Sequence, residues 1–181
     1  MLAKGFGATS VDDVCQKAGV TKGCFFHYFD SKDALGQALI EKWSGTREEV
    51  HQALFGNDKD PLKRVYHYIE SYAQMARQGA LGKGCLLGTF SSELADVAPI
   101  RKACADGFAA WTDHLARELA KAKALHAPKA KLDCRAVAEH FVATVEGAIL
   151  LAKAGQNDKV IARCVVQFKD YLAAVLGRQE K

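Results

Sequence analysis

Close cysteine pairs and metal-ligand clusters are missing from this sequence. No C-x-x-C pair and no short cluster of cysteine and histidine occurs, although the chain has six cysteines. These absences argue against a disulfide-rich secreted domain and against a zinc site. We therefore expect reduced thiols, and neither a metal nor another cofactor. The six cysteines are Cys15, Cys24, Cys85, Cys104, Cys134 and Cys164.

Long apolar runs and catalytic motifs are missing too. No run approaches 18 uninterrupted apolar residues and no charged-then-apolar leader opens the chain, so we expect neither a membrane span nor export, but a cytoplasmic protein. Cysteine, histidine and carboxylate residues are dispersed, without H-E-x-x-H or a comparable motif, so we do not expect an enzyme. Gly82, Gly84 and Gly88 follow no strand pattern and precede no Gly-Lys-Ser/Thr, which argues against a nucleotide site.

The sequence does contain a helical pattern along most of its length. Of its 181 residues, 49% are hydrophobic and 25% are charged, which is ordinary for a globular protein, and only three are prolines. Strand-like alternation is absent, so we predict an all-α fold. Helices are expected over residues 31 to about 54, 61 to about 78, 99 to about 125, 133 to about 154 and 158 to about 176.

Two short helices joined by a tight turn are predicted between positions 9 and 32. Ser10, with Asp13 three residues later, makes a capping-box start for the first helix, and Thr21 caps the second. Gly19 stands at the reversal, where a positive φ favours glycine and where we expect a bulky residue to push the helices apart. The pattern predicts a helix-turn-helix.

The second of these helices presents a mixed basic and aromatic surface. Phe25 and Phe29 fall on its inner face, which leaves the outer face to the other side chains. A helix-turn-helix protein inserts such a helix into the major groove of DNA. The outer residues are Lys22, Gly23, Cys24, Phe26, His27 and Tyr28.

The stretch from 5 to 43, and above all G-V-T-K-G-C-F-F-H-Y-F-D-S-K-D-A-L, closely resembles the N-terminal domain of the TetR/AcrR family of bacterial transcriptional regulators. The turn glycine, the Lys-Gly, the aromatic pair and the Ser-Lys all occur in register, which makes the signal specific. Family members carry a further helix before this unit, whereas this sequence begins at what looks like the last turn of that helix. Either the natural N-terminus lies upstream, which we favour, or the DNA-binding domain is genuinely trimmed and less stable.

The resemblance implies a division of the chain and a set of DNA contacts. We predict a DNA-binding domain over residues 1–45 and an effector-binding and dimerisation domain over residues 46–181. Phosphate contacts are implied for Thr9, Thr21, Phe26, Tyr28 and Lys32, and contacts to the groove floor for Lys22, Gly23, Cys24 and His27. The alternative is that Phe26 and Tyr28 belong to the core and that Lys22 and Lys32 are ordinary solvated charges.

The second domain carries a weaker resemblance. G-C-L-L, a short E-L-A segment and a helix bearing F-x-x-W resemble the effector domain of one branch of the family, which implies a cavity for a small molecule among the middle helices. The alternative is a plain apolar core. Cys85, beside Lys83 in a glycine-rich loop, is either a reactive thiol or a buried small hydrophobe, and we favour the latter. The expected lining is Tyr68, Tyr72, Cys85, Phe90, Phe108, Trp111 and His114.

The last two helices are predicted to form an antiparallel hairpin, each starting at an Asp cap, Asp133 and Asp158. Their apolar faces are larger than a hairpin needs, and the family pairs these helices with their copies in a second subunit. The alternative is that they pack only inside a monomer. The expected dimer contacts are Val137, Phe141, Val145, Ile149, Val165, Phe168 and Leu172.

These features predict a ligand-responsive DNA-binding transcriptional regulator, a homodimeric repressor that a small-molecule effector releases from a palindromic operator. Net charge does not decide the matter, since the formal value is only +4. The alternative is a helical small-molecule or thiol-based redox or electrophile sensor that acts without binding DNA directly.

Overall fold

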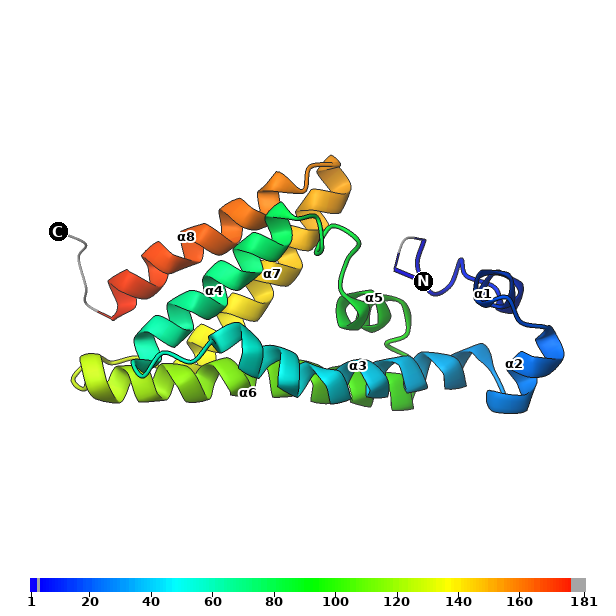
Figure 1. The fold of residues 1–181 in the computed structure, drawn as a ribbon, viewed down its shortest axis with the longest axis horizontal. Helices are drawn as coiled ribbons and strands as arrows, with labels where there is room; N and C mark the ends of the chain where they lie inside the picture. Colours follow the sequence, from blue (N-terminus) through cyan, green and yellow to red (C-terminus); the bar gives the residue numbers. More distant parts are fainter. Residues whose placement is uncertain (3, 177–181) are drawn as a thin grey trace. The chain divides into compact units, whose positions relative to one another are not determined.

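The computed structural model of the chain describes residues 1–2 and 4–176, and for residues 44–48 it describes the backbone alone. Within this part of the chain the secondary structure consists of eight helices and no strand (Figure 1), which confirms the all-α prediction. The helices are α1 (Val11–Ala18), α2 (Lys22–Tyr28), α3 (Lys32–Phe55), α4 (Pro61–Arg77), α5 (Leu86–Glu93), α6 (Ala98–His126), α7 (Cys134–Gly155) and α8 (Lys159–Val175).

The predicted capping signals start the first two helices. Ser10 Oγ accepts a hydrogen bond from Asp13 N at 3.1 Å, and Asp13 Oδ2 accepts one from Ser10 N at 2.7 Å, so the capping box is complete. Thr21 Oγ1 accepts a hydrogen bond from Cys24 N at 3.1 Å. These side chains satisfy amide groups that have no partner within the helix.

The turn between α1 and α2 depends on backbone conformation rather than on space. Gly19 has φ 69°, in the left-handed region that favours glycine. A Cβ atom added there would meet nothing within 4 Å. A Cβ atom at Gly19 therefore has room, and the φ angle is what calls for glycine. That a bulky residue would push the helices apart stays a prediction.

Two other local predictions need correction. The expected glycine-rich loop after residue 84 becomes α5, because Leu87 and Phe90 share one fully buried face and their burial outweighs the weak helix propensity of Gly88. Asp158 makes no capping hydrogen bond, since its carboxylate lies against Gly82. Asn157 Oδ1 instead accepts a hydrogen bond from Lys159 N at 3.2 Å.

The helices divide into two compact units. Unit 1 comprises Met1–Arg47 and Gly84–Gly107, and unit 2 comprises Glu48–Lys83 and Phe108–Lys181. Both α3 and α6 contribute residues to each unit, and α5 belongs to unit 1 although it lies far along the chain from α1–α2. The predicted domain boundary at residue 45 stays a prediction. The two units are defined by contacts between residues, and each of them combines separate stretches of the chain.

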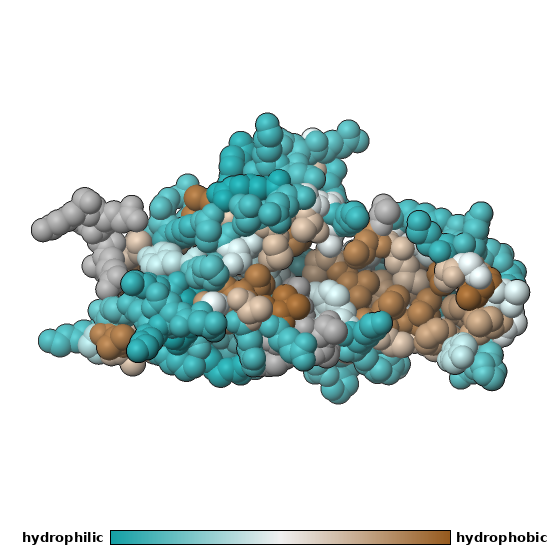
Figure 2. All heavy atoms as spheres, in the orientation of Figure 1, coloured by the Kyte–Doolittle hydropathy of each residue, from teal (hydrophilic) through white to brown (hydrophobic). Residues whose placement is uncertain are grey.

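Unit 1 has a small core around the two short helices and α5. Figure 2 shows hydrophobic residues gathered on part of the visible surface. In unit 1, side chains such as Val14, Leu35 and Leu39 are only half-buried. Among the described side chains of the unit, eight apolar ones are buried. They are Phe6, Cys15, Phe25, Ile40, Leu87, Phe90, Ile100 and Cys104.

Unit 2 is a helical layer in which α8 contacts both α4 and α7 (Figure 1). The apolar stripe predicted for α4 is buried, with Val65, Tyr68 and Ile69 fully enclosed. Pro61 occupies the first position of α4, and Asp60 Oδ1 accepts a hydrogen bond from Leu62 N at 2.8 Å, as the Asp-Pro pattern predicts.

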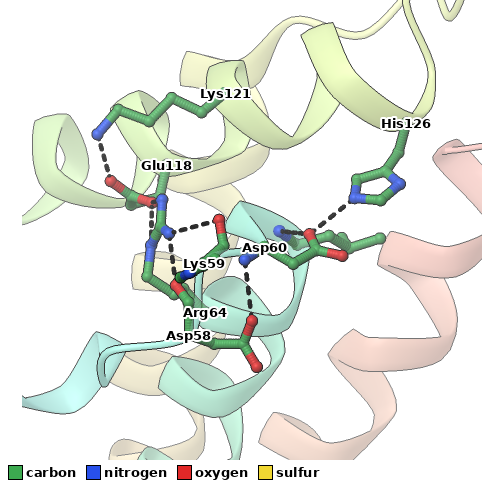
Figure 3. Close-up of polar contacts among 8 residues, drawn as sticks. Asp58, Lys59, Asp60, Arg64, Glu118, Lys121 and His126 are labelled. Carbon is green, nitrogen blue, oxygen red and sulfur yellow. Dashed lines mark hydrogen bonds and ion pairs between the residues drawn. The ribbon is translucent and has the colours of Figure 1, made fainter.

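A polar junction ties the start of α4 to the end of α6 inside unit 2 (Figure 3). Arg64 donates two hydrogen bonds to Glu118 Oε2, from Nε at 2.9 Å and from Nη2 at 2.6 Å. Lys121 adds a third to Glu118 Oε1 at 2.6 Å, and His126 Nε2 lies 2.7 Å from Asp60 Oδ1. The cap that starts α4 is thus anchored to α6.

Candidate functional site: a DNA-reading helix and a buried aromatic cluster

Helix α2 turns one face inward and the rest outward. Phe25 is buried and Phe29 half-buried, as predicted, and their rings lie 5.6 Å apart. Every residue predicted for the outer face is exposed: Lys22, Gly23, Cys24, Phe26, His27 and Tyr28.

Two large aromatic side chains stand out on this surface. Phe26 is 53% exposed and Tyr28 is 72% exposed, so neither is a core residue. The Phe26 ring leans edge-on against Phe25, and the Tyr28 ring leans against His27 with centroids 4.9 Å apart. Exposed aromatic groups beside polar ones are typical of a contact surface.

The one lysine of α2 is held at the start of the helix. Lys22 Nζ lies 2.9 Å from Asp12 Oδ1, and both side chains are largely exposed. The hydrogen bond with the Asp12 carboxylate raises the pKa of Lys22. Its ammonium group is charged and reaches solvent, where it can exchange the carboxylate for another acceptor.

Two of the predicted phosphate contacts have internal partners instead. Thr9 is buried, and its hydroxyl donates a hydrogen bond to Gly5 O at 2.6 Å. The Lys32 ammonium donates to Phe6 O at 2.9 Å and to Thr9 O at 3.0 Å. A DNA contact by either residue stays a prediction, and each holds the segment before α1 in this structure.

A buried cluster of aromatic and histidine side chains lies in unit 2. Trp111 Nε1 donates a hydrogen bond to Tyr68 Oη at 2.8 Å, and Tyr68 Oη lies 2.6 Å from His51 Nδ1. The Tyr72 hydroxyl is 3.4 Å from that of Tyr68. His114 stacks on His51 with ring centroids 5.3 Å apart. Polar groups from α3, α4 and α6 thus meet inside an apolar unit.

The structure brings most of the predicted effector lining together but not all of it. Tyr68, Tyr72, Trp111 and His114 share the cluster, and the Phe108 ring stacks on Trp111 at 6.4 Å. The two other predicted residues belong to unit 1. They are Cys85, half-buried at the N-cap of α5, and Phe90, which packs on Phe6.

Sequence reasoning missed His51 and Phe141 in this cluster. His51 is 1% exposed, and Phe141 packs within 5.7 Å of both tyrosine rings. His51 lies on α3, for which the sequence predicted a helix but no part in the effector site. His51 lies four residues before Phe55, which is buried. Residues four apart share one face of a helix, so this spacing could have identified His51 as an inward-facing residue.

The side chains predicted to contact a second subunit are all enclosed in the single chain. Each is at most 4% exposed, and α8 contacts both α4 and α7 within unit 2. A contact by any of them with a second subunit stays a prediction. These residues are Val137, Phe141, Val145, Ile149, Val165, Phe168 and Leu172.

Over residues 1–2 and 4–176, no group of three or more His, Cys, Asp or Glu side chains is arranged to hold a metal ion. In the same residues, no helix combines the length and hydropathy that a bilayer crossing requires.

A capped pair of short helices joined by a left-handed glycine, with the second helix exposed, defines a helix-turn-helix DNA-binding protein. Two family models match the chain: "Bacterial regulatory proteins, tetR family" over residues 1–39 and "Tetracyclin repressor-like, C-terminal domain" over residues 61–168. The chain belongs to the TetR family of bacterial transcription regulators. This confirms the resemblance seen in the sequence and the function expected of it, DNA-binding regulation of transcription.

Curated relatives agree with this assignment. The transcriptional regulator AcuR of Cereibacter sphaeroides is 33% identical over 156 residues, which cover 84% of this chain and 71% of the relative. The HTH-type transcriptional repressor DhaR of a Mycobacterium species is 27% identical over 158 residues, which cover 86% of this chain and 78% of the relative.

Solved structures share the fold. The regulatory protein TetR from Rhodobacter sphaeroides aligns with a TM-score of 0.80 at 29% identity, over 94% of this chain and 91% of that one. Reduced Escherichia coli NemR aligns with a TM-score of 0.78 at 24% identity, over 93% and 89% of the two chains, and this likeness concerns the fold alone.

Proposed function

We propose that this protein is a homodimeric repressor that a small-molecule effector releases from a palindromic operator. The observation that carries the proposal is the exposed outer face of α2, with Lys22, Cys24 and His27 in a chain whose relatives include a named repressor. Operators lie in the bacterial cytoplasm, so the protein acts there, and we assign it no catalytic step.

The outer face of α2 supplies two kinds of contact in this proposal. Lys22, Cys24 and His27 reach the floor of the major groove, where Gly23 lets the helix approach closely. Thr21, Phe26 and Tyr28 face the phosphate backbone and set the register of the helix. Phosphate contacts supply affinity that weakens with salt, whereas groove contacts supply sequence preference.

A dimer supplies the second reading helix. The outer faces of α7 and α8 are the surfaces that remain for a partner, and on α7 they include Leu150 at 65% and Leu151 at 60% exposure. Ala143 and Gly147 lie on the same outer side of α7, where small side chains permit close approach of another helix. A palindromic operator then requires the two α2 helices to sit roughly 34–36 Å apart.

The aromatic cluster of unit 2 is the candidate effector site. Small-molecule sites are mostly apolar with a few convergent polar groups, and His51, Tyr68 and Tyr72 supply such groups among aromatic rings. An effector that enters here must replace some of these hydrogen bonds. It lowers DNA affinity only to the extent that it binds the released conformation more tightly than the DNA-bound one.

Fluorescence anisotropy with DNA from the protein's own upstream intergenic region tests the proposal. We expect tight binding that weakens as salt rises. Lys22→Ala removes a groove contact and should lower affinity for the operator more than for unrelated DNA. His27→Ala should have the same effect. Lys159→Ala removes an exposed cation from unit 2 and serves as the control, with no expected effect.

Two outcomes would count against this function. Absence of binding by the folded dimer would favour a helical sensor that does not contact DNA. Equal effects of Lys22→Ala and Lys159→Ala would mean that α2 is not the reading helix.

A further inference from the structure

The five residues before Ser10, the N-cap of α1, form a tightly held segment, Gly5–Thr9, which we call the strap. Thr9 N donates a hydrogen bond to Phe6 O at 3.1 Å, and the Thr9 hydroxyl donates one to Gly5 O at 2.6 Å. The Phe6 side chain is 2% exposed. Ser10, the N-cap of α1, follows directly, so the strap fixes where the helix-turn-helix begins.

Lys32 holds the strap from the first turn of α3. Its ammonium donates to Phe6 O at 2.9 Å, to Thr9 O at 3.0 Å and to Gly7 O at 3.5 Å. The same group lies 4.3 Å from the centre of the Phe6 ring, within range of a cation–π interaction. Three carbonyl oxygens and one ring lie around the charge, so it is directed toward the strap inside unit 1.

Glu93 holds the strap from the last turn of α5. Its Oε2 accepts a hydrogen bond from Gly7 N at 2.7 Å. The carboxylate also lies so close to Gly5 that a Cβ atom there would fall 2.5 Å from Oε1, and Gly5 has φ +88°. Phe90, one turn earlier on α5, packs edge-on against Phe6 with ring centroids 5.2 Å apart.

We propose that Lys32 and Glu93 are positioning residues for DNA binding, which clamp the strap from α3 and α5 and thereby fix the orientation of the helix-turn-helix. The inference rests on the proposed function. The strap belongs to the segment that the N-terminal family model matches, whereas α5 belongs to the segment matched by the C-terminal model. A displacement of α5 therefore reaches α1 through the Glu93–Gly7 hydrogen bond and the Phe90–Phe6 contact.

The salt dependence of DNA binding distinguishes a positioning lysine from a phosphate contact. We expect Lys32→Met to weaken operator binding by about tenfold through the lost hydrogen bonds, with the slope of log affinity against log salt unchanged. Lys22→Ala is the comparison, since it removes a groove contact and should weaken operator binding more than binding to unrelated DNA. A slope that falls by about 1 in Lys32→Met would make Lys32 a phosphate contact and overturn its part of the proposal.

Glu93 gives an independent test with a conservative rescue. Glu93→Ala should weaken operator binding by about fivefold and speed hydrogen exchange at the Gly7 amide. Glu93→Gln keeps an acceptor oxygen and should stay within about twofold of the wild type. Ser92→Ala is the matched control, because its hydroxyl donates only to Gly88 O in its own helix.

A double-mutant cycle examines the contact itself. Gly5→Ala has two effects: it places a methyl group against the Glu93 carboxylate, and it strains a backbone with a positive φ. In a protein that already carries Glu93→Ala, the clash should disappear and the strain should remain. The two substitutions should therefore combine non-additively in operator affinity. Additive effects, or equal binding by Glu93→Ala and the wild type, would refute the clamp while leaving repression intact. Failure of the wild type to bind any DNA would refute the proposed function instead.

Discussion

A single glycine controls the reversal between α1 and α2 through its backbone angle. Gly19 has φ 69° and open space where a side chain would start. A Gly19→Ala substitution therefore measures the free-energy cost of a left-handed backbone conformation, because the added Cβ atom clashes with nothing. Few positions in a helix-turn-helix separate the two effects.

We predict that Gly19→Ala lowers the free energy of unfolding by about 1 kcal/mol and that Gly19→Asn lowers it less, because asparagine tolerates the left-handed region. Urea denaturation followed by circular dichroism measures both. Gly23→Ala is the control, since Gly23 lies in a helix without a positive φ and should gain roughly 0.5 kcal/mol. Equal losses for alanine and asparagine would show that something other than φ disfavours these side chains.

Residue-scale signals in the sequence identified the caps and the outer face of α2 but not the partners of Lys32. Ser10, Asp13 and Thr21 act within three residues of themselves, so spacing alone predicts their hydrogen bonds. Lys32 bonds to carbonyl groups 23 to 26 residues away. Which way a long cation points depends on chain packing that no local pattern encodes.

At the scale of elements, the junction between α4 and α6 should make stability depend on pH. Burial pushes the pKa of Glu118 up, but hydrogen bonds from Lys121 and Arg64 outweigh it and hold the pKa below its usual range. A carboxyl group whose pKa is lowered by folding stabilises the protein above its unfolded pKa of about 4.3. That contribution is lost as pH falls through the folded pKa.

Glu118→Gln should lower the free energy of unfolding by about 1–2 kcal/mol at neutral pH, and the difference from the wild type should shrink below about pH 4. Urea denaturation over a pH series measures it. Glu139→Gln removes an exposed carboxylate paired with Arg135 and should change stability by less than about 0.5 kcal/mol. A Glu118→Gln deficit that persists unchanged in acid would contradict this account.

Element boundaries could be predicted well, whereas what each face packs against could not. Asp60-Pro61 and Asp133 start helices where the sequence indicates. The spacing of apolar residues in α7 and α8 showed that one face of each helix is buried, but it did not show which residues cover that face. In the structure, helices of the same chain cover it, since α8 packs against both α4 and α7. The helix α5 escaped prediction because glycine at position 88 weakens the local signal, and burial of Phe90 depends on distant residues.

For the whole molecule, the outer side of α7 should carry the contact between subunits. We predict that Leu150→Glu combined with Leu151→Glu converts the protein to a monomer and lowers operator affinity at least about tenfold, because charge at a buried apolar contact is strongly unfavourable. Sedimentation velocity measures the first effect and anisotropy the second.

Leu125→Glu provides the matched control for this prediction. Leu125 is 63% exposed, much like Leu150, but it lies near the end of α6. Its substitution should leave a dimer with unchanged operator affinity. A dimer that survives the double substitution on α7 would place the contact between subunits elsewhere.

The exposure of Cys24 has a practical consequence. Of the six cysteines, all within the described residues, Cys24 is the exposed one, and it projects from the helix proposed to enter the groove. The rate at which a maleimide alkylates Cys24 therefore reports on DNA binding. Bound operator should lower this rate by shielding the thiol, and an inducing compound should restore the rate of the free protein. The same exposure makes a reducing agent advisable during purification, since two such thiols on neighbouring molecules can couple in air.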